Sequence, residues 1–122
     1  MPNERFKRLV AEAKGRISEI SPADAASAAA RGALLIDVRN RDEFAQAHAT
    51  GARHVCRGML ELDIEEIAPD AATPILCYCG GGSRSALAAE SLQKMGYTNV
   101  KSVAGGFRAW QECGLPVEKA AP

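Results

Sequence analysis

One cysteine in a glycine-rich segment is the residue best suited to do chemistry in this chain. Cys79 directly precedes a loop of small, polar and basic residues, namely Gly80, Gly81, Gly82, Ser83, Arg84 and Ser85. Glycines let successive backbone N–H groups turn toward one centre, and a helix that follows adds the positive end of its dipole. The segment therefore predicts a loop that binds an anion, either the Cys79 thiolate or the group that it carries.

The same loop predicts a reactive thiol at Cys79. An ordinary cysteine side chain has a pKa of about 8.5, so it is largely protonated at neutral pH. Inward N–H groups and a helix start favour the thiolate, which lowers the pKa and increases the nucleophilic form. Arg84 adds a positive charge that either binds an anionic donor or holds the loop in place, and the sequence leaves both roles open.

Alternating strand and helix patterns place this loop at the end of a buried strand. Residues 74–78 form an apolar run, and residues 83–95 carry alanine and leucine at helical spacing. Further strands are predicted at 17–20, 34–38, 52–55 and 100–103, and further helices at 6–15, 21–31, 42–47, 60–67 and 106–110. Strands that alternate with helices predict an α/β fold in which helices cover both faces of a mostly parallel sheet.

The length and composition fit a single domain. The chain has 122 residues, of which 47% are hydrophobic, and this is enough for a core. Within it we predict an amphipathic helix in residues 1–16 that packs on the domain, the domain itself in residues 17–117, and a frayed tail in residues 118–122.

Charge and cysteine usage exclude several classes of partner. Fifteen basic residues balance 15 acidic ones, so no net field favours nucleic acid or an anionic membrane. No apolar run has the length of a membrane span, and the N-terminus lacks the apolar region of a signal peptide. Cys77 and Cys79 are spaced too tightly for the usual zinc or dithiol motifs. We expect reduced thiols in the cytoplasm, with no metal and no cofactor.

Three segments carry motifs that occur in a characteristic order. The first comprises Leu35-Ile36-Asp37-Val38-Arg39, Glu43-Phe44, His48 and Gly51-Ala52; the second is Tyr78 to Ser85; the third is Val103 to Trp110 with Gly114-Leu115-Pro116. Together they resemble the signatures of the rhodanese family of sulfurtransferases, over roughly residues 17 to 117, with Ala47 and Ala49 in place of a usual Gly and Ile. The resemblance implies a rhodanese-like three-layer fold, with a central, mostly parallel five-stranded sheet and helices on both faces.

The resemblance also implies a sulfur transfer in two steps. Cys79 attacks the outer sulfur of a donor such as thiosulfate, holds that sulfur as a persulfide, and passes it to cyanide or a thiol. The implied partners are therefore a small-molecule donor and acceptor, with a protein as a further candidate sulfur acceptor. Transfer from an ionised thiol needs no general base, so we expect His48 and His54 to be surface or packing residues.

The other residues that stand out have expected roles outside the chemical step. Asp37 and Arg39 predict an ion pair that braces the sheet, and Glu43 belongs to the same structural signature. Arg57, in the connection before Leu60, is predicted to line the mouth of the pocket and to meet an anionic donor.

Two alternatives stay open. The same fold can carry a sulfur-carrier or partner-binding module that does not turn over. A cysteine and an arginine around an anion loop also occur in cysteine phosphatases and arsenate reductases. Four residues separate Cys79 from Arg84, one fewer than in the phosphatase loops that we compare with it. A smaller ring offers fewer inward N–H groups to a transferring phosphoryl group, and this favours sulfur transfer.

Overall fold

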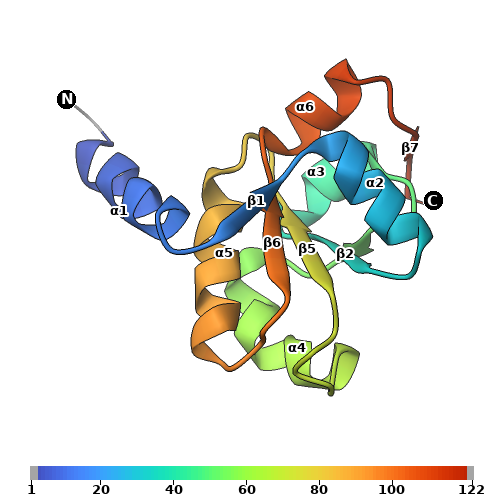
Figure 1. The fold of residues 1–122 in the computed structure, drawn as a ribbon. Coiled ribbons are helices and arrows are strands. Elements are labelled where there is room, and N and C mark those ends of the chain that lie inside the picture. Colours follow the sequence, from blue (N-terminus) through green and yellow to red (C-terminus); the bar gives the residue numbers. More distant parts are fainter. Residues whose placement is uncertain (1–2, 121–122) are drawn as a thin grey trace.

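A parallel five-stranded sheet forms the centre of the protein in the computed structural model, which describes residues 3–120 (Figure 1). Its strands are β1 (Ser18–Ile20), β2 (Leu34–Asp37), β4 (Arg53–His54), β5 (Ile75–Tyr78) and β6 (Val100–Val103). They lie in the order β1-β6-β5-β2-β4, and every neighbouring pair is parallel. The wholly buried β5 is the middle strand, so Cys79 leaves the sheet at its centre.

Helices cover both faces of this sheet, because alternate residues of each strand point to opposite sides. The helices are α1 (Glu4–Lys14), α2 (Pro22–Ala30), α3 (Arg41–Gln46), the 3₁₀ turn η1 (Arg57–Met59), α4 (Leu60–Ile67), α5 (Ser83–Lys94) and α6 (Gly106–Glu112). Ile36 and Ile75 pack with Ile64 of α4 and Leu92 of α5 on one face. Leu35 and Tyr78 pack with Ala25 of α2 and Trp110 of α6 on the other. The predicted three-layer α/β fold is confirmed.

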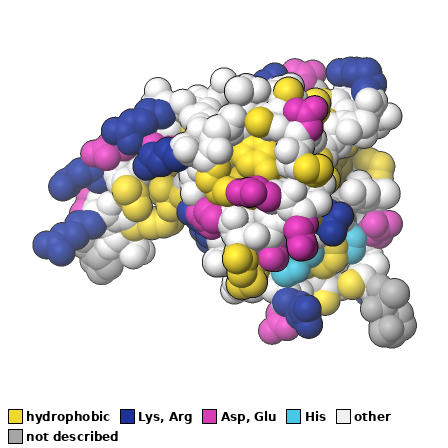
Figure 2. Space-filling model, turned by 90° about the horizontal axis from the view of Figure 1, so that it is seen from below, with side chains coloured by type: hydrophobic (Ala, Val, Ile, Leu, Met, Phe, Trp, Pro, Cys, Tyr) yellow, Lys and Arg dark blue, Asp and Glu magenta, His cyan; other side chains and the backbone are white. Residues whose placement is uncertain are grey.

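The N-terminal helix α1 projects from the domain and packs only partly against it (Figure 1). Val10 and Ala13 are buried where α1 meets α5, whereas Phe6 and Leu9 stay exposed. Figure 2 shows basic side chains along the outer edge of α1 and hydrophobic ones between it and the rest of the molecule. None of the helices in residues 3–120 combines the length and the apolar character that a membrane span requires.

A second, two-stranded sheet is the main feature that the sequence pattern did not predict. In it β3 (His48–Ala49) pairs antiparallel with β7 (Val117–Glu118), and the Ala120 N–H donates to the Ala45 carbonyl at 3.2 Å. Residues 118–120 of the expected frayed tail are therefore tied to the domain, whereas residues 1–2 and 121–122 lie outside the described part. Strands of two residues are too short to show an alternating pattern.

Candidate active site

The loop after β5 turns its backbone toward the sulfur of Cys79. Gly82 has a φ of 99°, a conformation that glycine adopts without strain, and it is the N-cap of α5. Its N–H donates to Cys79 Sγ at 3.1 Å. One N–H of the predicted nest is thus directed at this sulfur, at the start of a helix whose dipole favours negative charge.

These donors change the ionisation of the thiol. Burial disfavours the charged thiolate, but hydrogen bonds from the Ser85 side chain and from the N–H groups of Ser85, Gly82 and Gly81 outweigh it. Together they hold the pKa of Cys79 below its ordinary value. Thiolate is therefore more populated at neutral pH than in an ordinary cysteine.

Ser85 is held in turn by a serine of the neighbouring strand. Its Oγ lies 2.8 Å from the Oγ of Ser102 on β6, and both side chains are fully buried. Because a hydroxyl both donates and accepts, this contact leaves the Ser85 proton free to point at Cys79 when Ser102 donates. Ser102 was not among the residues predicted from the sequence, since a lone serine in a strand has no local signal. Only the pairing of β5 with β6, with Cys77 opposite Ser102, brings it to the site.

A second glycine turn supports the loop from the start of α6. The Phe107 N–H donates to the Cys79 carbonyl at 2.7 Å, and the Arg108 N–H donates to the Gly80 carbonyl at 3.1 Å. Gly106, with a φ of 56°, lies so close that a Cβ there would overlap the Cys79 carbonyl oxygen. The second and third sequence motifs therefore form one structure, in which α6 fixes the backbone of Cys79.

Arg84 folds back over the same loop. A Cβ built on Gly80 would lie 3.7 Å from Arg84 Nη2, and Arg84 Nη1 donates to Glu43 Oε1 at 3.5 Å. The guanidinium is partly exposed, with 37% of the Arg84 side chain accessible. A positive charge that solvent can reach thus lies beside the loop.

The match to a family model agrees with this geometry. A model described as "Rhodanese-like domain" matches residues 21–113. The chain belongs to the rhodanese family. Thiosulfate sulfurtransferase GlpE of Haemophilus influenzae is 38% identical over 102 residues, which cover 84% of this chain and 95% of the relative. Thiosulfate sulfurtransferase GlpE of Pseudomonas putida is 40% identical over 89 residues, which cover 73% of this chain and 78% of the relative.

Solved structures show the same rhodanese fold. The polysulfide-sulfur transferase homodimer of Wolinella succinogenes has a TM-score of 0.82 and 30% identity, and the match covers 98% of this chain and 90% of that one. A protein of unknown function from Rhodopseudomonas palustris, described as a possible tyrosine phosphatase, has a TM-score of 0.84 and 33% identity, with 93% of each chain covered.

Other residues of the first rhodanese signature form a buried brace beside the loop. Arg39 Nη2 donates to Asp37 Oδ2 at 2.8 Å and to the Ala47 carbonyl at 2.7 Å, while its guanidinium lies 4.3 Å from the Phe107 ring centre. Asp37 and Arg39 are 0% and 5% exposed. The pair links β2 to the segment before β3 and to α6, which is the bracing role predicted for it.

Arg57, which we predicted to line the mouth of the pocket, is paired with a glutamate of α4. Its Nη1 donates to Glu61 Oε2 at 2.7 Å, and the same oxygen accepts from Ser91 Oγ at 2.6 Å. Burial opposes ionisation of Glu61, but these hydrogen bonds from Ser91 and Arg57 hold its pKa below the ordinary value. The Arg57 charge is thus engaged between α4 and α5, because the i,i+4 spacing with Glu61 favours a local pair.

The other cysteines and the histidines lie in different surroundings from Cys79. Cys77 is fully buried, and burial raises its pKa to about 12, so it stays a protonated packing residue. His48 Nδ1 lies 2.9 Å from the Phe44 carbonyl, and His54 Nε2 lies 2.7 Å from the Arg39 carbonyl. Both rings therefore have backbone partners away from the Cys79 sulfur.

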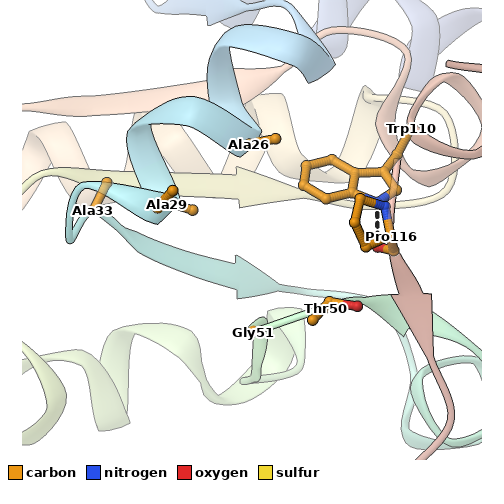
Figure 3. Close-up of a pocket in the computed structure, with 8 residues that line it drawn as sticks. Ala26, Ala29, Ala33, Thr50, Gly51, Trp110 and Pro116 are labelled. Carbon is orange, nitrogen blue, oxygen red and sulfur yellow. Dashed lines mark hydrogen bonds between the residues drawn. The ribbon is translucent and has the colours of Figure 1, made fainter. Parts of the chain in front are cut away.

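A pocket of about 310 Å³ lies elsewhere, between α2 and α6 (Figure 3). Alanines of α2 face the Trp110 ring across it, and Trp110 Nε1 donates to the Pro116 carbonyl at 2.9 Å. No residue of the loop from Cys79 to Ser85 lines this pocket. This pocket is therefore separate from the loop that holds Cys79.

The lowered pKa of Cys79 predicts a shifted pH profile for alkylation. Because the folded-state pKa is lowered, thiolate persists to lower pH, and the rate of reaction with iodoacetamide should fall only as the pH drops through that lowered value. The rate of alkylation at Cys79 is measured by peptide mass spectrometry from pH 5 to 10, a range that includes the ordinary cysteine pKa of about 8.5. The same chain in denaturant is the control. A folded-state midpoint at or above that of the unfolded chain would contradict the electrostatic role of the loop.

Proposed function

We propose that this chain is a rhodanese-type sulfurtransferase that moves sulfane sulfur from thiosulfate, or a similar donor, to a thiophilic acceptor through a persulfide on Cys79. The observation that carries the proposal is the Cys79 sulfur at the centre of backbone donors, where its pKa is lowered. The relatives named thiosulfate sulfurtransferase support the choice of donor. Cyanide and small thiols are the acceptors that fit this chemistry.

The reaction runs in two displacements. The Cys79 thiolate attacks the outer sulfur of thiosulfate; the sulfur–sulfur bond of the donor breaks, and sulfite leaves with its electron pair. The persulfide anion that remains is held by the N–H groups that had held the thiolate. Cyanide then attacks the terminal sulfur, thiocyanate leaves, and the Cys79 thiolate is restored. Neither step needs a proton from a general acid, and the rings of His48 and His54 are hydrogen-bonded to the backbone carbonyls of Phe44 and Arg39.

The size of the loop favours sulfur over phosphoryl transfer. Only four residues separate Cys79 from Arg84. The donors found at Cys79 are aimed at the sulfur itself, with the Gly82 N–H at 3.1 Å. A transferring phosphoryl group needs donors to three equatorial oxygens beyond that sulfur. We therefore assign sulfur transfer to this chain, although one structurally similar protein is described as a possible tyrosine phosphatase.

We place the reaction in the cytoplasm. All four cysteines of the chain are free, as is usual in a reducing compartment. The donor and the acceptor are small molecules, and a thiol of another protein is a further candidate acceptor for the Cys79 persulfide.

Intact mass spectrometry tests this function directly. Incubation with thiosulfate should add the mass of one sulfur atom, and later addition of cyanide should remove it with the release of thiocyanate over many turnovers. Sulfur that loads but is never released to cyanide or thiols would identify a carrier. Failure to load, together with Cys79-dependent release of phosphate from an aryl phosphate, would establish the phosphatase alternative and overturn the assignment.

A further inference from the structure

We propose that Glu43 is a specificity-determining residue that weakens the preference of the Cys79 site for dianionic sulfur donors. It acts by partly neutralising Arg84 at the loop. The proposal rests on the proposed function for the identity of the donor, but not for the electrostatic effect itself. Neutral or singly charged donors, such as alkyl persulfides, would then compete better with thiosulfate than they could at an unpaired arginine.

Glu43 is fixed in place by the helix that carries it. It is the third residue of α3, and its Oε1 accepts the N–H of Asn40 at 3.0 Å, which is one half of a capping box. This bond is local and independent of Arg84. The carboxylate therefore keeps its position whether or not the arginine contacts it.

The same oxygen faces Arg84 across the loop. Arg84 Nη1 donates to Glu43 Oε1 at 3.5 Å, a long contact between side chains that are 37% and 40% accessible. The other end of the guanidinium lies close to Gly80, the residue that follows the nucleophile. A donor that approaches Cys79 along this side meets the arginine and the carboxylate together.

The Glu43 charge opposes the attraction that Arg84 offers to an anion. In a water-like dielectric, one unit charge about 7 Å from a dianion changes its binding by about three- to tenfold. A monoanion feels half of that interaction and a neutral reagent almost none. Glu43 therefore discriminates between donors by charge without touching the sulfur that reacts.

Substitution by glutamine isolates this charge. Glu43→Gln keeps an oxygen that can accept the Asn40 N–H, since glutamine also serves in the capping box, and it removes the negative charge. Glu65→Gln is the matched control: it makes the same charge change at an exposed position on α4, where Glu65 acts on Tyr97 rather than on the loop. Thermal unfolding of both variants verifies that the fold is retained.

Alkylation of Cys79 gives a readout that does not depend on sulfur transfer. The ratio of the rates with iodoacetate and with iodoacetamide cancels the thiolate fraction and reports the local field. We expect Glu43→Gln to raise this ratio by about two- to fourfold at low salt, with the gain reduced near physiological salt. Glu65→Gln should leave the ratio unchanged. An unchanged or lower ratio in Glu43→Gln would overturn the proposal, and a lower one would show that Glu43 mainly holds Arg84 in place.

Steady-state kinetics with thiosulfate complete the test. Glu43→Gln should lower KM for thiosulfate by about three- to tenfold at low salt, with kcat for transfer to cyanide changed little. A KM for thiosulfate that stays at the wild-type value would overturn the proposal. If wild type and variant both fail to load sulfur, the proposed function fails, while the alkylation ratio still decides the role of Glu43.

Discussion

Cys79→Ser is expected to reduce thiocyanate formation from thiosulfate and cyanide by about a thousandfold or more. A serine hydroxyl is not ionised by this loop at neutral pH, and it cannot carry the transferred sulfur as a persulfide. The measurements are the rate of thiocyanate formation and the intact mass after incubation with thiosulfate, in which the added sulfur should be missing. The fold should survive, because serine is nearly isosteric with cysteine.

A variant that keeps only Cys79 is the control for this result. Cys56 and Cys113 are replaced by serine, and the buried Cys77 by alanine, with thermal unfolding recorded in parallel. It should retain sulfur transfer, because no other cysteine precedes an anion-binding turn. Loss of activity with the fold intact would reveal a second thiol in the reaction, and equal activity of wild type and Cys79→Ser would remove Cys79 as the nucleophile.

Gly106→Ala is expected to disable the site without touching any reacting group. A Cβ at this position would overlap the Cys79 carbonyl oxygen and lie 2.9 Å from the carbonyl atoms of Gly80. The φ of 56° adds strain of about 1 to 2 kcal/mol for a residue with a side chain. Relief requires the loop backbone to move, which disturbs the N–H groups around the sulfur. We expect sulfur transfer to fall by about a hundredfold or more.

Gly114→Ala separates the two components of that effect. Gly114 also has a positive φ, of 72°, but a Cβ there would meet nothing within 4 Å. The Gly114→Ala substitution should lower the free energy of unfolding by the backbone strain alone, about 1 to 2 kcal/mol, and leave activity close to wild type. Gly106→Ala should cost about 1 to 3 kcal/mol more because of the overlap. The measurements are the rate of sulfur transfer and chemical denaturation of both variants. Equal loss of activity in the two would show that the close approach of Gly106 is unimportant.

Much of this protein was already determined by local sequence. The run of three glycines after Cys79, the apolar segment before it and the alanine-rich segment after it specify a strand, a turn and a helix through short-range preferences. Regular alternation of strands and helices was enough to predict the parallel sheet and its two helical layers, since a crossover between parallel strands needs an intervening segment such as a helix. Local patterns of this kind predict helices and strands correctly where the tertiary packing favours the same secondary structure.

Tertiary structure alone decided which distant groups meet at Cys79. Ser102 comes within reach of Ser85 because β6 pairs with β5, and the Phe107 N–H holds the Cys79 carbonyl because α6 starts above the loop. Glu43 faces Arg84 across 41 positions of the chain, and Arg57 pairs with Glu61. Contacts of this kind depend on strand order and on which of several nearby charges is closest. Neither quantity has a periodic signature in the sequence. The residue types therefore pointed to Cys79, but only the folded chain could show which residues surround it.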